Sequence, residues 1–314
     1  MNPFHYLDLP TLAGEFYVEL IKKNDILGRI ANALNAPNLT QEQIVFLTTL
    51  NNTNFLKKLL TDTQDDLEAY ASTVNQSLFW DGSRSTPFGT IVLDIFGYQN
   101  FRKNAKSKWL TEQLKIKTCP YCNAQYTISS KKKLYHTFDH FFPKSLYPYL
   151  SVSFYNLIPA CNTCNQGKSN KDVDLANHWH PYDGTNLMEE FQFEIEPKSA
   201  SEFALDYSND SILEIRMKPN INLSEKAKNH FEHFNLDVQY KAHTDIAAEA
   251  IWKSKVYTGS YRKELQDLFS TKNIQLTESE IKRFIIGNYA DPADVHKRPL
   301  AKLTSDLAKD LGLI

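Results

Sequence analysis

This chain has few features of exported, repetitive or membrane-spanning proteins. Nowhere in its 314 residues do eighteen apolar residues follow one another, so the sequence predicts no transmembrane helix. The first thirty residues lack the basic start, apolar run and cleavage site of an export signal. We find no internal repeat or low-complexity segment. We therefore expect a folded cytoplasmic protein without a membrane partner, whose 42% of hydrophobic residues suffices for two or three structural units.

The chain also lacks the excess of positive charge that is typical of nucleic-acid-binding proteins. Its 35 Lys and Arg residues stand against 37 Asp and Glu residues, a net charge of −2. The basic residues are concentrated, however. The segment from Arg102 to Asp172 contains twelve of them and three acidic residues, which gives it a net charge of +9. The other 243 of the 314 residues therefore carry a net charge of −11. This basic centre favours contact with a phosphate backbone; the alternative is a solvated lysine face.

Cysteine is scarce, and all four cysteines fall into two C-x2-C pairs, Cys119/Cys122 and Cys161/Cys164. Two such turns can close a tetrahedral four-thiolate zinc site, which is structural because no coordination position stays open. Disulfides are the alternative, but a chain without an export signal favours metal thiolates. Any chemistry must therefore come from neighbouring residues.

The segments on either side of the cysteines are predicted to be mainly helical. Residues 1–97 show helical spacing, a capping box at Thr40 to Gln43, a helix near 65–74 and a loop over 85–89, but no chemical motif. We interpret this region as a scaffold or a partner-binding surface. We expect three regions: a helical one over 1–97, a central one over 98–190, and one over 191–314 with a small β element followed by helices.

The central and C-terminal regions give more detailed expectations. Helical spacing continues over 98–114, and residues 126–128 and 134–138 are predicted to form a hairpin around the polar run 129–133. A short helix is expected from Lys168 to before His180. Further on, alternation over 191–195 and 212–217 predicts two strands with a turn at 208–210. Ser224 and Thr277 are expected helix caps, and 240–270 has a long helical pattern.

Three polar residues between and beside the cysteine pairs carry the chemistry that we expect. Hydrolysis of a phosphodiester requires an activated water and a cation that neutralises the charge on the phosphorane. His140 can act as general base because its pKa is ordinarily near neutrality. Asp139 can bind a hard divalent ion through oxygen. Asn156 has an amide with which to brace the loop that carries His140.

Three further residues complete this candidate site. Asn165 follows Cys164 directly, so the second cysteine turn places it, and its side-chain oxygen can join Asp139 as a ligand of Mg²⁺ or Mn²⁺. Lys144 and Lys168 are candidates for contact with phosphate.

These residues resemble a known family. The segments CPYCN at 119–123, DHFFPK at 139–144 and NLIPACNTCNQGK at 156–168 are similar to the ββα-metal HNH endonucleases of the zinc-knuckle type. The resemblance implies an α+β fold in which an HNH core with a four-cysteine zinc site is flanked by helical regions. It also implies that His140 is the base, Asn156 the central asparagine, and Asn165 a metal ligand at a position where many members have histidine.

Over roughly residues 98–185, the sequence further resembles HNH proteins that accompany ATPases in bacterial anti-phage systems such as Septu and related retrons. This resemblance implies a DNA endonuclease in antiviral defence. One alternative is a zinc-dependent nucleic-acid-binding or adaptor protein in which the HNH fold is only a scaffold. Another is a nuclease that an ATPase partner licenses.

The remaining histidines and tyrosines have less specific interpretations. His178 and His180 either reach the metal or pack locally, and His136 either touches phosphate or is structural. His230 and His233 lack a carboxylate at metalloprotease spacing, so we expect them to be structural. Three tyrosines are expected to pack around the hairpin rather than to stack bases: Tyr147, Tyr149 and Tyr155.

Overall fold

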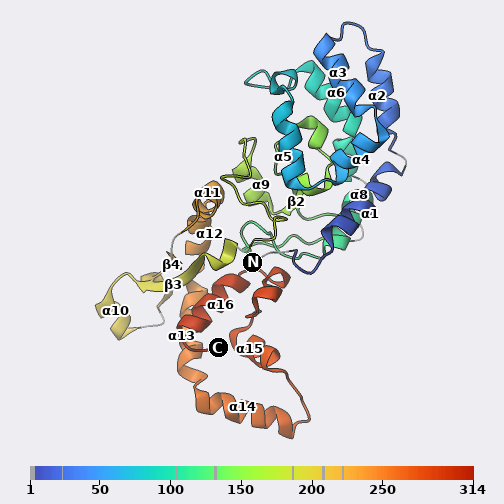
Figure 1. Cartoon of the computed structure of the whole chain (residues 1–314). Helices are drawn as coiled ribbons and strands as arrows, with labels where there is room; N and C mark the ends of the chain where they lie inside the picture. The colour runs from blue at the N-terminus through green and yellow to red at the C-terminus, as the bar shows by residue number, and fades with distance from the viewer. Residues whose placement is uncertain are drawn as a thin grey trace. The chain divides into compact units, whose positions relative to one another are not determined.

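The computed structural model describes residues 4–22, 24–103, 105–130, 133–185, 187–206, 209–220 and 223–314. Lys131 and Lys132 of the expected hairpin loop, and Ser208 of the expected turn, lie outside them. The chain divides into two compact units, shown with their elements in Figure 1. The N-terminal unit comprises Phe4–Lys115 and Thr127–Gly184, and the C-terminal unit comprises Ile116–Tyr126 and Thr185–Ile314.

The N-terminal unit begins with a series of short helices. Their bounds are α1 Leu9–Ile21, α2 Ile26–Leu34, α3 Gln41–Leu50, α4 Thr53–Thr61, α5 Gln64–Thr73, α6 Pro87–Phe96, α7 Tyr98–Lys103 and α8 Ala105–Leu114. The capping box at Thr40 is confirmed, since the Thr40 and Gln43 side chains each accept a hydrogen bond from the other residue's backbone. The loop expected over 85–89 is wrong beyond its second residue. Thr86 caps α6 and Pro87 takes its first position, where proline fits a helix.

These helices support the segment 148–156 through aromatic contacts. Phe16 of α1 lies 5.8 Å from Phe154, and Phe46 of α3 lies 5.5 Å from Tyr149, ring centroid to ring centroid. The Ser153 hydroxyl donates a 2.7 Å hydrogen bond to the Leu59 carbonyl of α4. Aromatic pairs of this kind contribute about 0.5–1.5 kcal/mol each beyond burial. The N-terminal helices therefore fix a segment that runs directly into the second strand.

Two short strands and a helix follow in this unit. Strand β1, Thr137–His140, pairs antiparallel with β2, Leu157–Ala160, with His140 opposite Leu157, and α9, Asn162–Lys168, packs against β1. The expected hairpin over 126–138 is confirmed only near its turn, where Ser129 and Leu134 form an antiparallel bridge and the Tyr135 N–H donates a 3.1 Å hydrogen bond to the Ile128 carbonyl. The described part of that segment forms no extended ladder, and β1 pairs with β2, which is buried along its whole length.

The helix expected after Lys168 is also wrong. Helix α9 lies just before that position and ends at Ser169, whose φ of 54° breaks the helical path. The described residues from 169 to 180 contain no helix. The short helix thus comes earlier in the chain than expected, because a C-x2-C pair is typical of a turn rather than of the start of a helix.

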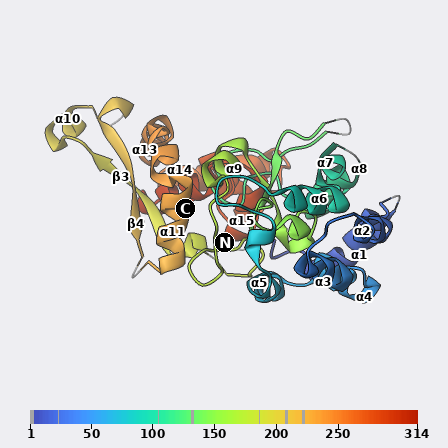
Figure 2. The same ribbon diagram turned by 90° about the horizontal axis from the view of Figure 1, so that it is seen from above.

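The C-terminal unit contains the expected small β element followed by helices. Strands β3, Phe191–Pro197, and β4, Leu213–Pro219, pair antiparallel, and Figure 2 shows them as a long hairpin with α10, Ala200–Leu205, at its far end. The helices that follow are α11 Glu225–Phe234, α12 Leu236–Lys241, α13 Thr244–Val256, α14 Gly259–Thr271, α15 Glu278–Ile286 and α16 Ala301–Asp310. The caps at Ser224 and Thr277 are confirmed, and the long pattern over 240–270 splits where Thr258 caps α14.

The α+β fold with mainly helical flanks and small sheets is thus confirmed. Within the described ranges, every helix is too short or too polar to cross a lipid bilayer.

Candidate active site and metal centre

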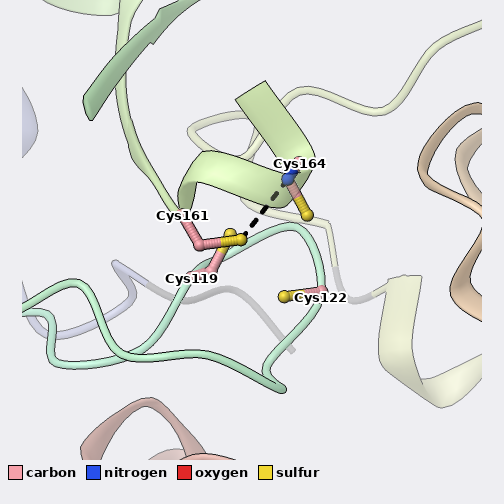
Figure 3. Close-up of side chains that lie close together, drawn as sticks. All are labelled: Cys119, Cys122, Cys161 and Cys164. Atoms are coloured by element: carbon pink, nitrogen blue, oxygen red, sulfur yellow. Dashed lines mark hydrogen bonds between the residues drawn. The ribbon is translucent and has the colours of Figure 1, made fainter. Parts of the chain in front are cut away.

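The four cysteines gather at one point. Their sulfur atoms all lie within 4.8 Å of one another, and all four side chains are buried. Figure 3 shows Cys119 and Cys122 on a turn opposite Cys161 and Cys164 at the start of α9. All four are thiols, so the disulfide alternative is not supported. Among the described residues, this is the one group of three or more metal-ligating side chains.

The arrangement fits a tetrahedral zinc ion. Zn–S bonds of about 2.3 Å require sulfur atoms that lie roughly 3.8 Å apart, which the cluster allows. Backbone N–H groups already point at the sulfurs: those of Ala124 and Cys164 donate to the Sγ atoms of Cys122 and Cys161, each at 3.4 Å. Such donors stabilise thiolates, the form that binds metal.

The first cysteine turn is held by residues far away in the sequence. His230 Nε2 donates a 2.7 Å hydrogen bond to the Tyr121 carbonyl, and the Tyr240 hydroxyl donates to the Cys122 carbonyl. Asn123, at a φ of 50°, donates from its amide to the Val295 carbonyl at 2.8 Å. Sequence reasoning treated His230 as structural without finding its partner and missed the other contacts, because no motif links 119–123 to α11, α12 or residue 295.

His140 ends β1 and is only 5% exposed. Its Nε2 lies 3.0 Å from the Ser151 carbonyl, which can only accept, so Nε2 carries the proton and Nδ1 has a lone pair. Burial, and next the charge of Lys144, lowers the pKa of His140 well below its usual value. The imidazole is therefore neutral at pH 7, with Nδ1 as its proton acceptor.

Asp139 and Lys168 form a buried pair beside His140. Asp139 is 3% exposed and Lys168 is 2% exposed. Lys168 Nζ lies 3.6 Å from Asp139 Oδ2 and donates a 2.6 Å hydrogen bond to the His140 carbonyl. Lys168 was expected to contact phosphate, but in this structure it ties α9 to the end of β1 instead.

Asn156 is fully buried and spans the loop that follows His140. Its Nδ2 donates to the carbonyls of Phe142 and Leu150 at 3.1 and 2.9 Å, and its Oδ1 accepts a 2.7 Å bond from the Phe142 N–H. Three backbone groups are thereby satisfied by one side chain. This arrangement can brace the loop between His140 and Ser151.

The other two expected site residues are more accessible. Asn165 lies on α9 and is partly exposed. Lys144 is also partly exposed, and its Nζ lies 5.7 Å from the centroid of the Tyr98 ring. Burial lowers the pKa of Lys144; Asp139 opposes this effect, while Arg102 adds to it. Lys144 and Arg102 therefore place positive charge near Asp139.

The remaining histidines make local contacts. His136 is buried, with Nε2 3.3 Å from the Thr111 hydroxyl and Nδ1 3.3 Å from the Ile128 carbonyl, and burial lowers its pKa to about 4. His180 packs against Phe141 at 4.3 Å, ring to ring. These positions favour the structural alternative, as does the burial of the three tyrosines expected to pack: Tyr147, Tyr149 and Tyr155.

Comparison with known proteins covers this same region. Residues 119–171 match the family model of HNH endonucleases. The chain is 35% identical over 81 residues to the Septu protein PtuB of Bacillus thuringiensis. That match takes in 24% of this chain and 30% of the relative, so the chain spans about 30% of the length of the curated relative. No solved structure matches the chain significantly. The chain thus carries an HNH endonuclease domain at 119–171, as its sequence predicted.

Proposed function

We propose that this chain is a metal-dependent endonuclease that hydrolyses phosphodiester bonds in DNA. The observation that carries the proposal is the state of His140 within the HNH domain. Its Nε2 is committed to the Ser151 carbonyl, which leaves Nδ1 to accept a proton from water. An attacking water so activated would cleave the bond on the 3′ oxygen side and leave a 5′ phosphate.

The neighbouring residues take the supporting roles. Asp139 and Asn165 offer a carboxylate and an amide oxygen, a donor set that suits Mg²⁺ or Mn²⁺. When bound, such an ion neutralises charge on the phosphorane and on the departing oxygen. Asn156 holds the loop behind His140 through its three backbone hydrogen bonds. Lys144 contacts the phosphate, and the four cysteines bind structural zinc.

We also propose that the enzyme acts in anti-phage defence, together with an ATPase partner that licenses it. The similarity to a Septu protein supports the first part. The burial of His140 and Asp139 supports the second, because side chains only 5% and 3% exposed cannot meet a DNA phosphate without a rearrangement. A partner that binds the helical regions can supply the free energy for this opening.

The substrate assignment is tested with purified protein on supercoiled plasmid, single-stranded DNA and RNA, each with Mg²⁺, Mn²⁺ or EDTA. We expect metal-dependent nicking of DNA with 5′ phosphate ends, and stronger nicking when a cognate ATPase is added. Cleavage of RNA alone would contradict the assignment. Binding of DNA that is insensitive to divalent ions and never leads to cleavage, with or without the ATPase, would favour the adaptor function instead.

A further inference from the structure

Helix α7 lies outside the segment that matches the HNH family model, yet it contacts the candidate base. The Tyr98 ring, 5% exposed, meets the His140 ring edge to face, with centroids 4.5 Å apart and planes at 69°. Its hydroxyl lies 3.4 Å from the Phe138 carbonyl, to which it donates. Tyr98 therefore contacts both the strand that carries His140 and the imidazole itself.

The same tyrosine ring also contacts the candidate phosphate-binding residue. Lys144 Nζ lies 5.7 Å from its centroid, within the range of a cation–π interaction. Arg102 follows Tyr98 by four residues on α7, so it lies on the same helix face one turn further on. One aromatic side chain thus contacts both the proton acceptor and the positive charge of the site.

We propose that Tyr98 is a positioning residue for His140, a role that rests on the proposed function of His140 as base. The hydrogen bond from Nε2 to the Ser151 carbonyl fixes one end of the imidazole but permits the ring to tilt about that bond. The Tyr98 ring blocks this tilt and so sets the direction of Nδ1. Because Lys144 lies over the same ring, Tyr98 also sets the distance between the base and the phosphate.

The contact can matter for rate because proton abstraction requires accurate alignment. A misplacement of about 1 Å in a reacting group can cost on the order of 100-fold in rate. Removing the Tyr98 ring leaves space beside the His140 imidazole. The hydrogen bond from Nε2 to the Ser151 carbonyl then has to orient the ring without this contact. Removing only the hydroxyl leaves the ring in contact with both His140 and Lys144.

The test compares Tyr98→Leu, which removes the ring, with Tyr98→Phe, which keeps it. Tyr135→Leu is the matched control, since Tyr135 also lies under a lysine, Lys133 at 5.5 Å, but is 56% exposed. Zinc content and circular dichroism verify the fold of each variant. The first readout is the ¹⁵N spectrum of the histidine rings, with the His140 signals identified by their loss in His140→Ala. The second is kcat and KM for plasmid nicking.

We expect wild type, Tyr98→Phe and Tyr135→Leu to show one neutral His140 tautomer with the proton on Nε2. Tyr98→Leu should show mixed or broadened His140 signals, and a kcat that is about 10- to 100-fold lower at unchanged KM. Unchanged His140 signals in Tyr98→Leu, or equal effects of the Leu and Phe variants, would overturn the proposal.

Two other outcomes are also decisive. If wild type does not cleave even with the cognate ATPase, the proposed function fails, whereas the ring signals still decide whether Tyr98 positions His140. If Tyr98→Leu does not fold, wild-type protein must show nuclear Overhauser contacts between the Tyr98 and His140 ring protons, and their absence would refute the inference.

Discussion

The loop between β1 and β2 is held by hydrogen bonds between its backbone and two side chains, His140 and Asn156. Asn156 satisfies three backbone groups, and the Ser151 carbonyl selects the tautomer of His140. His140 and Asn156 could be identified from the sequence because each belongs to a short motif, whereas the Ser151 carbonyl could not. The contacts made by residues outside these motifs, such as Tyr98, His230 and Tyr240, could not be predicted, because no local sequence pattern links these residues to their partners.

Asn156→Ala should destabilise the fold strongly. The substitution removes the side-chain partner of the buried Phe142 N–H and carbonyl, which costs about 1–3 kcal/mol per group and on the order of 3 kcal/mol in total after relaxation, while the Leu150 carbonyl keeps its hydrogen bond from the Ser153 N–H. Urea unfolding of zinc-loaded protein measures the loss. Asn165→Ala is the control, expected within about 0.5 kcal/mol of wild type because its side chain is partly exposed. Equal stability of both variants would refute the bracing role.

Acid should weaken the fold through His136. Its pKa is about 4 in the folded protein because of burial, against 6.5 ordinarily. Above pH 6.5 the ring is neutral in both states, so it contributes no pH dependence. As the pH falls from 6.5 to 4, the unfolded chain gains a proton that the folded chain resists, so stability is lost, by about 3 kcal/mol at most.

His136→Gln isolates this contribution from acid effects on the zinc site, which both proteins share. We expect the stability advantage of wild type over the variant, measured by urea unfolding, to shrink between pH 7 and pH 4.5. An advantage that stays constant over this range would mean that His136 does not titrate in this way.

At the scale of elements, β1, β2 and α9 form the unit that holds the candidate site. Sequence patterns predicted a strand over 134–138 that pairs back in a hairpin, which forms only near its turn, but they missed β2 as the main partner of β1. Strand β2 has four residues and contains Pro159, so it lacks the alternation by which strands are recognised. Strand β2 is recognised by its burial along its whole length, which is tertiary information. By contrast, the capping boxes at Thr40 and Thr277 are local and were predicted correctly.

The junction of α9 with β1 depends on the buried pair of Lys168 and Asp139. Lys168→Met should cost on the order of 3–5 kcal/mol, because it removes the ammonium group that lies 3.6 Å from the buried Asp139 carboxylate. The double variant Lys168→Met/Asp139→Asn should recover much of this loss. Thermal unfolding of wild type, both single variants and the double variant measures the coupling. Additive losses would show that the two side chains do not interact.

At the scale of the whole molecule, the four-cysteine cluster joins turns that lie far apart in the sequence. Because thiolates this close repel one another, bound zinc should contribute folding free energy directly. We expect a strong chelator, or Cys161→Ser, to lower the melting temperature and to expose amides of 116–126 to hydrogen exchange. Ser169→Ala, outside the cluster, is the control. A melting temperature that is independent of zinc would contradict a structural metal site.

The charge distribution matters at this scale too. The basic segment 102–172 contains the HNH domain, while the rest of the chain has a net negative charge. Composition could reveal this asymmetry, but it could not reveal that His140 and Asp139 are buried. Their burial is what makes licensing by a partner part of the proposed function.

The most direct test of the account is nicking of supercoiled plasmid by wild type and His140→Ala, with Mg²⁺, Mn²⁺ or EDTA, alone and with a cognate ATPase. His178→Ala serves as a matched control, since the His178 ring is hydrogen-bonded to the backbone of Asp174 and lies outside the segment that matches the HNH family model. We predict metal-dependent nicking by wild type and His178→Ala, and its loss in His140→Ala with zinc and fold intact. Full nicking by His140→Ala would contradict the account.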